Sequence, residues 1–173
     1  ARRAAPARLT VAGGVKTPED IAEADDLGAD AQVGMALYTG VFDLAEGFCA
    51  VLDSDRADGW WPTIVTDERG AALGLVYSSL ESVRASLEIG AGVYFSRSRR
   101  ALWRKGETSG ATQELVSIDV DCDRDALRFV VRQRGSGFCH LGTATCFGAP
   151  RGIGQLEATI RDRIADAPPG SST

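Results

Sequence analysis

The residues most able to do chemistry lie in one acidic run, DVDCDRD at residues 119–125. If a strand continues through this run, alternation of side chains predicts that its four aspartates face one way and Cys122 faces the other. Four carboxylates on one edge repel each other, so a hard cation such as Mg²⁺ would neutralise two or three of them. A solvated, aspartate-rich turn is the alternative, and spacing alone does not decide between the two.

Two more thiols, Cys139 and Cys146, flank a glycine-containing loop with six residues between them. Soft thiolates in such a loop suit Zn²⁺. Adding Cys122 gives three sulfur ligands and leaves one tetrahedral position open, as a catalytic zinc site requires. The only histidine, His140, is either structural, a fourth ligand or a proton carrier. Cys49 lies in an apolar run and is expected to be a packed thiol.

A basic and aromatic stretch, SRSRRALWRKGETSG at residues 96–110, precedes both groups. Its cations, hydroxyls and aromatic ring suit an anionic phosphate ester that carries a flat ring. Nucleic acid is a rival ligand, but the net charge of −5 argues against a general binder of phosphate backbones. An exposed basic loop with no ligand is the third possibility.

Composition places these motifs in an ordinary globular protein of 173 residues, 44% of them hydrophobic. Apolar stretches such as residues 31–42 fall well short of the roughly 18 residues that a membrane span needs. Four cysteines are too few for a disulfide scaffold, and no signal peptide opens the chain. We therefore expect the protein to be located in the reducing cytoplasm. Because the chain lacks a starting Met and stops in PPGSST, we expect a piece of a longer protein.

Residues 1–55 show the order strand, helix, strand, helix, which predicts a parallel βαβα unit. The strands are expected at residues 9–11 and 31–34; the first helix is capped by Thr17, has Pro18 at its first position and ends at Gly28, and the second begins near Asp43.

This first unit resembles the last two βα units of the phosphoribosylformimino isomerase of histidine biosynthesis, a TIM barrel. The segments LTVAGGVKTPEDI, LGADAQVGMALYTG and FDLAE carry the resemblance. It implies a phosphate cradle made of backbone amides at Gly13, Gly14, Gly34 and Met35. The strands with the family's catalytic aspartates are absent, so no isomerase activity is implied. A remnant without a ligand is the alternative.

The second unit, residues 57–148, is expected to be an α+β domain, mostly antiparallel strands with one main helix. Strands are predicted at residues 63–65, 73–77, 93–95, 115–121 and 127–133, with a helix between Ser78 or Ser79 and Gly90. In residues 115–121, alternation puts Val116, Ile118 and Val120 on one side. From residue 155 the pattern of Leu156, Ile160 and Ile164 indicates another helix.

Three ordered motifs, SRSRRALWRKGETSG, DCDRD and CHLGTATC followed by Phe147, closely resemble phosphoribosyl-AMP cyclohydrolase of histidine biosynthesis, from about Trp60 to Gly148. Residues 153–173, with QLEATI and PPGSST, resemble the start of a phosphoribosyl-ATP pyrophosphohydrolase domain. That domain's carboxylate-bearing helices are absent, so its activity is not implied. Together the resemblances indicate part of a multifunctional histidine-pathway fusion.

The cyclohydrolase resemblance implies Mg²⁺ ligands at Asp121, Asp123 and Asp125 and Zn²⁺ ligands at Cys122, Cys139 and Cys146. It also implies a homodimer in which each zinc site takes Cys122 from one subunit and the two loop cysteines from the other. The implied reaction is hydrolysis of the N1–C6 bond of the adenine ring in 1-(5-phosphoribosyl)-AMP, with zinc activating water and His140 as the proton acceptor.

The implied substrate-binding residues all come from the basic stretch: Arg97, Ser98, Arg99, Trp103, Lys105 and Glu107. Arg97, Arg99 and Lys105 would supply charge against phosphate, while Trp103 either stacks on the base or packs into the protein. Leu141 departs from the family, which usually has Thr there. Two other functions stay open: a catalytically silent, zinc-stabilised dimer that serves as a scaffold, and a phosphate binder built on the barrel-like unit.

Overall fold

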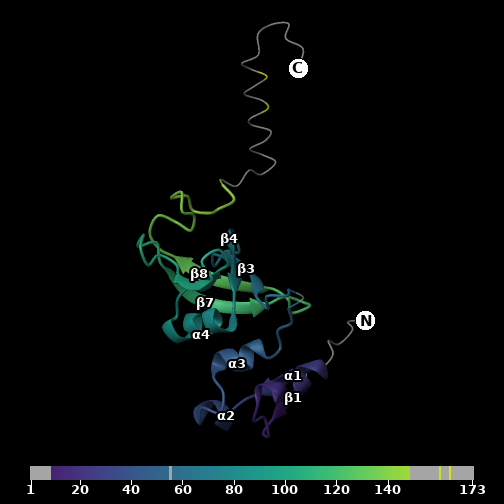
Figure 1. The fold of residues 1–173 in the computed structure, drawn as a ribbon. Helices are drawn as coiled ribbons and strands as arrows, with labels where there is room; N and C mark the ends of the chain where they lie inside the picture. The colour runs from purple at the N-terminus through teal and green to yellow at the C-terminus, as the bar shows by residue number, and fades with distance from the viewer. Residues whose placement is uncertain (1–8, 55, 149–159, 161–163, 165–173) are drawn as a thin grey trace.

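A computed structural model describes residues 9–54 and 56–148, together with residues 160 and 164 (Figure 1). The helix predicted from residue 155 and the pyrophosphohydrolase-like segment 153–173 therefore lie outside the described residues, apart from Ile160 and Ile164. Within the described part, no helix combines the length and apolar character needed to cross a membrane.

The first unit has the predicted βαβα order. It consists of β1 (Leu9–Ala12), α1 (Pro18–Asp26), β2 (Ala29–Gln32), α2 (Met35–Tyr38) and α3 (Leu44–Cys49), and β1 pairs with β2 in parallel. Helices α1 and α3 begin where the sequence indicates because each has a reciprocal cap, Thr17 with Asp20 and Asp43 with Glu46. The second strand begins two residues earlier than predicted, and the short helix α2 was not anticipated.

The second unit is a six-stranded sheet with one main helix, which confirms the α+β prediction. Its elements are β3 (Trp61–Thr66), β4 (Ala72–Ser78), α4 (Leu80–Ile89), β5 (Val93–Ser96), β6 (Ala101–Arg104), β7 (Gln113–Val120) and β8 (Leu127–Gln133). The strand order is β6-β5-β4-β3-β8-β7, and only the β3–β8 pair is parallel. Strand β6 falls inside the basic stretch and was not predicted.

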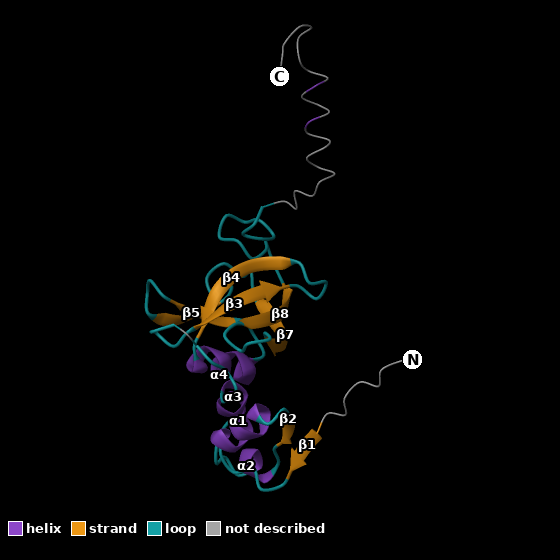
Figure 2. Ribbon diagram, turned by 90° about the vertical axis from the view of Figure 1, so that its right-hand side faces the viewer, coloured by secondary structure: helices purple, strands orange, loops and turns teal. Residues whose placement is uncertain are grey.

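Helix α4 lies against one face of this sheet, and α3 and α1 follow below it (Figure 2). The core contains fully buried apolar side chains from both the sheet and the helix. Val65, Tyr94, Phe129 and Val131 come from the sheet, and Val83 comes from α4. Arg84 joins the two units through ion pairs with Asp43 and Glu46 of the α3 cap. Ala45 of α3 belongs to the same buried core cluster, and Phe48 packs against it, so the first unit is part of the same packed body.

The opposite face of the sheet carries apolar side chains that remain exposed. Ile64 of β3 and Leu75 of β4 lie opposite each other in register and are 47% and 56% exposed.

On β7 the predicted alternation is wrong for Val116, which is 47% exposed, because the ladder with β8 shifts register between Leu115 and Ser117. A bulge of this kind turns one residue out of the alternation. Leu115, Ile118 and Val120 are the residues that pack against the core.

A buried pair of hydroxyls between β3 and β4 gives a first testable prediction. Thr63 Oγ1 and Ser78 Oγ lie 2.7 Å apart and both residues are fully buried. Thr63→Val should lower the free energy of unfolding by about 1–2 kcal/mol, because Ser78 loses its partner away from water. Adding Ser78→Ala should recover part of that loss in urea denaturation, since an apolar pair leaves no polar atom unsatisfied. Strictly additive losses in this double-mutant cycle would contradict the interpretation.

Candidate active site

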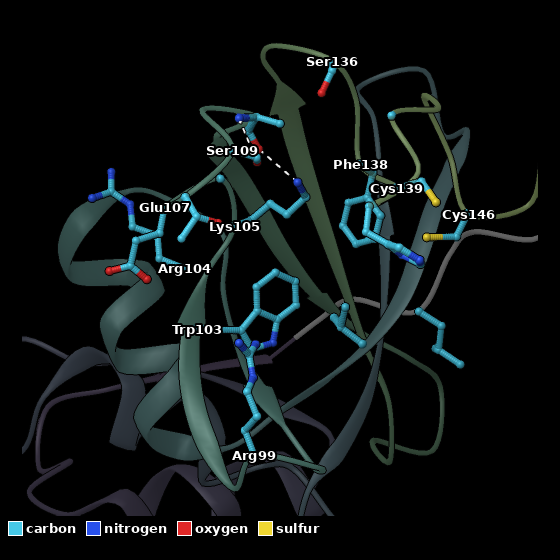
Figure 3. Close-up of a pocket in the computed structure, with 17 residues that line it drawn as sticks. Arg99, Trp103, Arg104, Lys105, Glu107, Ser109, Ser136, Phe138, Cys139 and Cys146 are labelled. Atoms are coloured by element: carbon cyan, nitrogen blue, oxygen red, sulfur yellow. Dashed lines mark hydrogen bonds between the residues drawn. The ribbon is translucent and has the colours of Figure 1, made fainter.

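A cavity of about 520 Å³ lies between β4, β6, the loop after β6 and the cysteine-containing loop near the end of the described chain (Figure 3). The sequence motifs at residues 99–109 and 136–146, far apart in the chain, meet in its wall. Seven predicted site residues line it: Arg99, Trp103, Lys105, Glu107, Cys139, His140 and Cys146. Arg104, Ser109, Ser136 and Phe138 also line it and were not singled out from the sequence.

The cysteine loop is held in shape by its own backbone. Cys139 N–H donates to the carbonyl of Thr143 at 3.1 Å, and Cys146 N–H donates to the carbonyl of Leu73 on β4 at 2.8 Å. The sulfur atoms of Cys139 and Cys146 lie on the same side of the cavity in Figure 3. The nearby Leu141 N–H, and after it the side chain of Thr143, lower the pKa of the Cys139 thiol. The loop thus presents two soft ligands, one of them favoured as a thiolate.

Lys105 is the buried cation of the cavity, with 8% of its surface exposed. Its Nζ donates to the carbonyl of Ala111 at 3.1 Å (Figure 3) and to that of Gly137 at 3.5 Å. The same nitrogen lies 5.6 Å from the centre of the Phe138 ring. Removal from water lowers the pKa of Lys105, while the nearby Cys146 and Cys139 thiols oppose that shift. The ammonium is therefore held at a fixed place beside the cysteine loop.

The other predicted binding residues divide between the cavity and its surroundings. Arg99 lines the cavity, and its Nε donates to Ser96 Oγ at 3.3 Å. Arg97 instead lies over the Tyr77 ring, 3.9 Å from its centre, and neither it nor the exposed Ser98 is among the lining residues. Trp103 both lines the cavity and packs on Tyr94, with ring centres 5.3 Å apart.

The acidic run does not continue strand β7, which ends at Val120. The chain turns back instead, and Asp121 N–H donates to the carbonyl of Ala126 at 3.2 Å. The predicted division of side chains required a continuing strand and therefore does not apply: Asp119, still on β7, pairs with Arg128, and the Cys122 sulfur lies 4.0 Å from an oxygen of Asp123. Turn geometry overrides alternation because the strand has already ended.

Asp121, Asp123 and Asp125 nevertheless converge. One carboxylate oxygen from each lies within 4.8 Å of the others, and among the described residues they are the one such group of three potential metal ligands. Oxygen ligands at this spacing fit a hard divalent cation such as Mg²⁺. The three cysteines do not form a comparable group within the described chain, since Cys122 lies on this acidic turn and the other two lie on the cavity wall.

Arg124, in the middle of the acidic turn, connects it to the first unit. Its φ of 67° places a non-glycine residue in the left-handed region. Its guanidinium pairs with Asp25 at the end of α1 at 2.5 Å, and its carbonyl accepts from Asp53 N–H at 2.8 Å. Sequence spacing gives no sign of this contact, because almost 100 residues of chain separate Asp25 from Arg124.

A second cavity lies at the ends of β1 and β2. Gly13, Gly14, Gly34 and Met35, the four residues of the implied phosphate cradle, all line it. The carboxylate of Asp20 already accepts from Lys16 N–H and Thr17 N–H nearby, at 2.7 and 2.9 Å. The α1 N-terminus is thus occupied by the chain's own carboxylate.

Comparison with known proteins bears on the larger unit. Residues 74–148 match the family model described as "Phosphoribosyl-AMP cyclohydrolase". The chain is 57% identical over 130 residues to the histidine biosynthesis bifunctional protein his7 of Schizosaccharomyces pombe, covering 75% of this chain and 31% of that protein. It is 56% identical over 124 residues to the histidine biosynthesis trifunctional protein of Neurospora crassa, covering 72% of this chain and 14% of the relative.

A bacterial relative, the histidine biosynthesis bifunctional protein HisIE of Thermus thermophilus, is 43% identical over 123 residues, covering 65% of this chain and 57% of the relative. The chain therefore spans less than two thirds of the length of each of these relatives. Their bifunctional and trifunctional names agree with the predicted relation to a multifunctional fusion.

Proposed function

Because residues 74–148 belong to the phosphoribosyl-AMP cyclohydrolase family, we propose that the chain hydrolyses the N1–C6 bond of the adenine ring in 1-(5-phosphoribosyl)-AMP, a step of histidine biosynthesis. The observation that carries this proposal is the single cavity in which two thiols, His140, Lys105 and Trp103 meet. Sulfur ligands, a proton carrier, a cation and an aromatic ring are the groups that a metal-assisted hydrolysis of a nucleotide base requires.

The cavity suits a phosphorylated nucleotide in size and charge. Its volume of about 520 Å³ falls within the range of roughly 300–1,000 Å³ typical of small-molecule sites. Arg99 and Arg104 add cations to that of Lys105, and Trp103 offers a flat apolar surface to a base. Glu107, on the same wall, is placed for a polar contact with the substrate.

Cys139 and Cys146 would hold a zinc ion together with Cys122 of a second subunit. The two neighbouring thiols on one side of the cavity fit such an ion, and the separation of Cys122 from the pair within one chain supports a site shared between two copies. The exposed Ile64 and Leu75 face, whose residue Leu75 also lines the cavity, offers apolar surface for the homodimer. A zinc ion bound there supplies Lewis acidity toward water.

The remaining roles fall to side chains of this chain. His140 is exposed on the cavity wall and would accept the proton released when water attacks C6. Asp121, Asp123 and Asp125 would hold Mg²⁺ and thereby attract a phosphate of the substrate. A cytoplasmic location remains the expectation for an enzyme of this kind.

The cavity lined by Gly13, Gly14, Gly34 and Met35 favours a second candidate function, binding of a phosphate ester by the barrel-like unit. Affinity for ribose 5-phosphate that Gly34→Asp abolishes would support it, because an added carboxylate would repel the phosphate and the space around Gly34 is open. Unchanged affinity would exclude it.

The proposed activity is tested by following ring opening through absorbance, with purified protein, phosphoribosyl-AMP, Zn²⁺ and Mg²⁺. We expect turnover that a chelator abolishes and added Zn²⁺ restores. A folded, zinc-loaded dimer without turnover would contradict the proposal and favour the silent scaffold. Leu141, on the cysteine loop, would then be the first residue to exchange for Thr.

A further inference from the structure

We infer that Tyr94, Gln113 and Gln133 form a buried positioning relay that fixes the ammonium group of Lys105 in the cavity. The inference rests on the proposed function only in the effect it assigns to substrate affinity. None of the three relay residues lines the cavity. Each therefore acts through Lys105 rather than on the substrate.

The relay is an unbroken series of hydrogen bonds from the core to the cavity. Tyr94, fully buried on β5, donates from its hydroxyl to Gln113 Oε1 at 2.6 Å. Gln113 Nε2 donates to Gln133 Oε1 at 2.9 Å, and these two residues face each other in the β7–β8 register. Gln133 Nε2 then donates to the carbonyl of Ala111 at 3.2 Å, the same oxygen that accepts from Lys105 Nζ at 3.1 Å.

Tyr94 sets the orientation of both amides in this series. A hydroxyl that donates to Gln113 must meet the amide oxygen, so the Gln113 nitrogen faces Gln133. Gln133 then accepts with its oxygen and turns its own nitrogen toward three carbonyls, those of Ala111, Thr112 and Arg134. Without the hydroxyl, the Gln113 amide is free to rotate and Gln133 loses its fixed partner.

Close packing prevents the Ala111 carbonyl from moving independently of the relay. Gly106 has a φ of +84°, and a Cβ there would lie 2.4 Å from the carbonyl carbon of Ala111. At Gly92 a Cβ would lie 2.2 Å from Gln113 Oε1. Ala111 is itself 2% exposed. The acceptor that holds Lys105 is thus fixed on one side by the chain backbone and on the other by Gln133.

Lys105 has three N–H donors, and the carbonyls of Ala111 and Gly137 account for two of them. The third is available to an acceptor in the cavity. A fixed ammonium meets an anionic substrate without first losing side-chain freedom, and this preorganisation strengthens binding. Loss of the relay should therefore raise KM more than it lowers kcat.

The chain contains only two lysines, Lys105 and the exposed Lys16, which allows a test that does not depend on activity. The full-length protein is acetylated under limiting reagent, and the ratio of Lys105 to Lys16 modification is measured by mass spectrometry. Tyr94→Phe keeps the ring but removes the donor. It should raise this ratio about five-fold, the change expected from the loss of one ordinary hydrogen bond. Thr63→Val, which removes a buried hydroxyl outside the relay, is the matched control and should leave the ratio unchanged.

Kinetics then separate positioning from a general loss of structure. Tyr94→Phe should raise KM about three- to ten-fold, and it should add nothing further to KM in a Lys105→Ala background. A fall in kcat at constant KM, or an unchanged labelling ratio, would overturn the relay. If the wild-type protein has no turnover, the proposed function fails, while the labelling ratio alone still decides whether Tyr94 fixes Lys105.

Discussion

Two inactive variants, Cys122→Ser and Cys139→Ser, should recover about one quarter of wild-type turnover when they are mixed and exchange subunits. Each variant homodimer lacks one thiol in both of its sites. If the zinc site is shared as proposed, the intact Cys122 of one subunit in a mixed dimer meets the intact Cys139 and Cys146 of the other, so one of two sites is complete. Random exchange makes about half of the dimers mixed, which gives the expected fraction.

The chain provides controls for this complementation. Mixing Cys139→Ser with Cys146→Ser should restore nothing, because both thiols lie on the same loop and every site in the mixture stays incomplete. Cys49→Ala should retain turnover, since burial raises the pKa of that thiol to about 12 and it packs against the core. No recovery from Cys122→Ser with Cys139→Ser, in a sample that native mass spectrometry shows to contain mixed dimers, would contradict a shared zinc site.

Gly74→Ala should cost about 1–3 kcal/mol in the free energy of unfolding and lower turnover by more than about ten-fold. A Cβ at Gly74 on β4 would lie 2.1 Å from the ring of Phe138, a buried residue. The ring cannot remain in place, and it is bonded through the next peptide to Cys139. The substitution therefore displaces the cysteine loop as well as reducing stability. Thermal denaturation and the ring-opening assay measure the two effects.

A compensating change tests whether the clash is the cause. Gly74→Ala combined with Phe138→Leu should regain stability relative to Gly74→Ala alone, because the smaller side chain makes room for the methyl group. Ala72→Val on the same strand, where the side chain is exposed, should leave both stability and turnover near the wild-type values. Equal losses in Gly74→Ala with and without Phe138→Leu would show that the contact is unimportant.

The elements that sequence patterns predict best are those with local causes. The helix caps at Thr17, Asp43 and Ser79 involve residues only three positions apart, so both partners of each cap can be recognised within a short stretch of sequence. The bulge at Val116 and the turn after Val120 depend instead on pairing with β8; alternation was wrong for Val116 and does not indicate where the strand ends. Strand β6 was missed because its charged and aromatic residues resemble a binding loop more than a strand.

The candidate site divides in the same way. Family resemblance predicts that residues 97–107 and 139–146 share one site, and the cavity is lined by both segments, though not by Arg97 or Ser98. Resemblance does not indicate the carbonyls of Ala111 and Gly137 that hold Lys105, because backbone acceptors have no sequence signature. The contact between Gln113 and Gln133 cannot be predicted from the sequence either, because it depends on the register between β7 and β8.

The contacts of Arg124 with Asp25 and Asp53 also limit how this protein can be divided and recombined. The family match begins at residue 74, yet β3, one of the two central strands of the sheet, and the residues that contact Arg124 lie before that point. A chimera joined at the family boundary would carry the aspartates but not the residues that shape their turn. The smallest portable piece with an intact acidic turn therefore starts upstream of α1, and the barrel-like segment belongs to the scaffold of this turn.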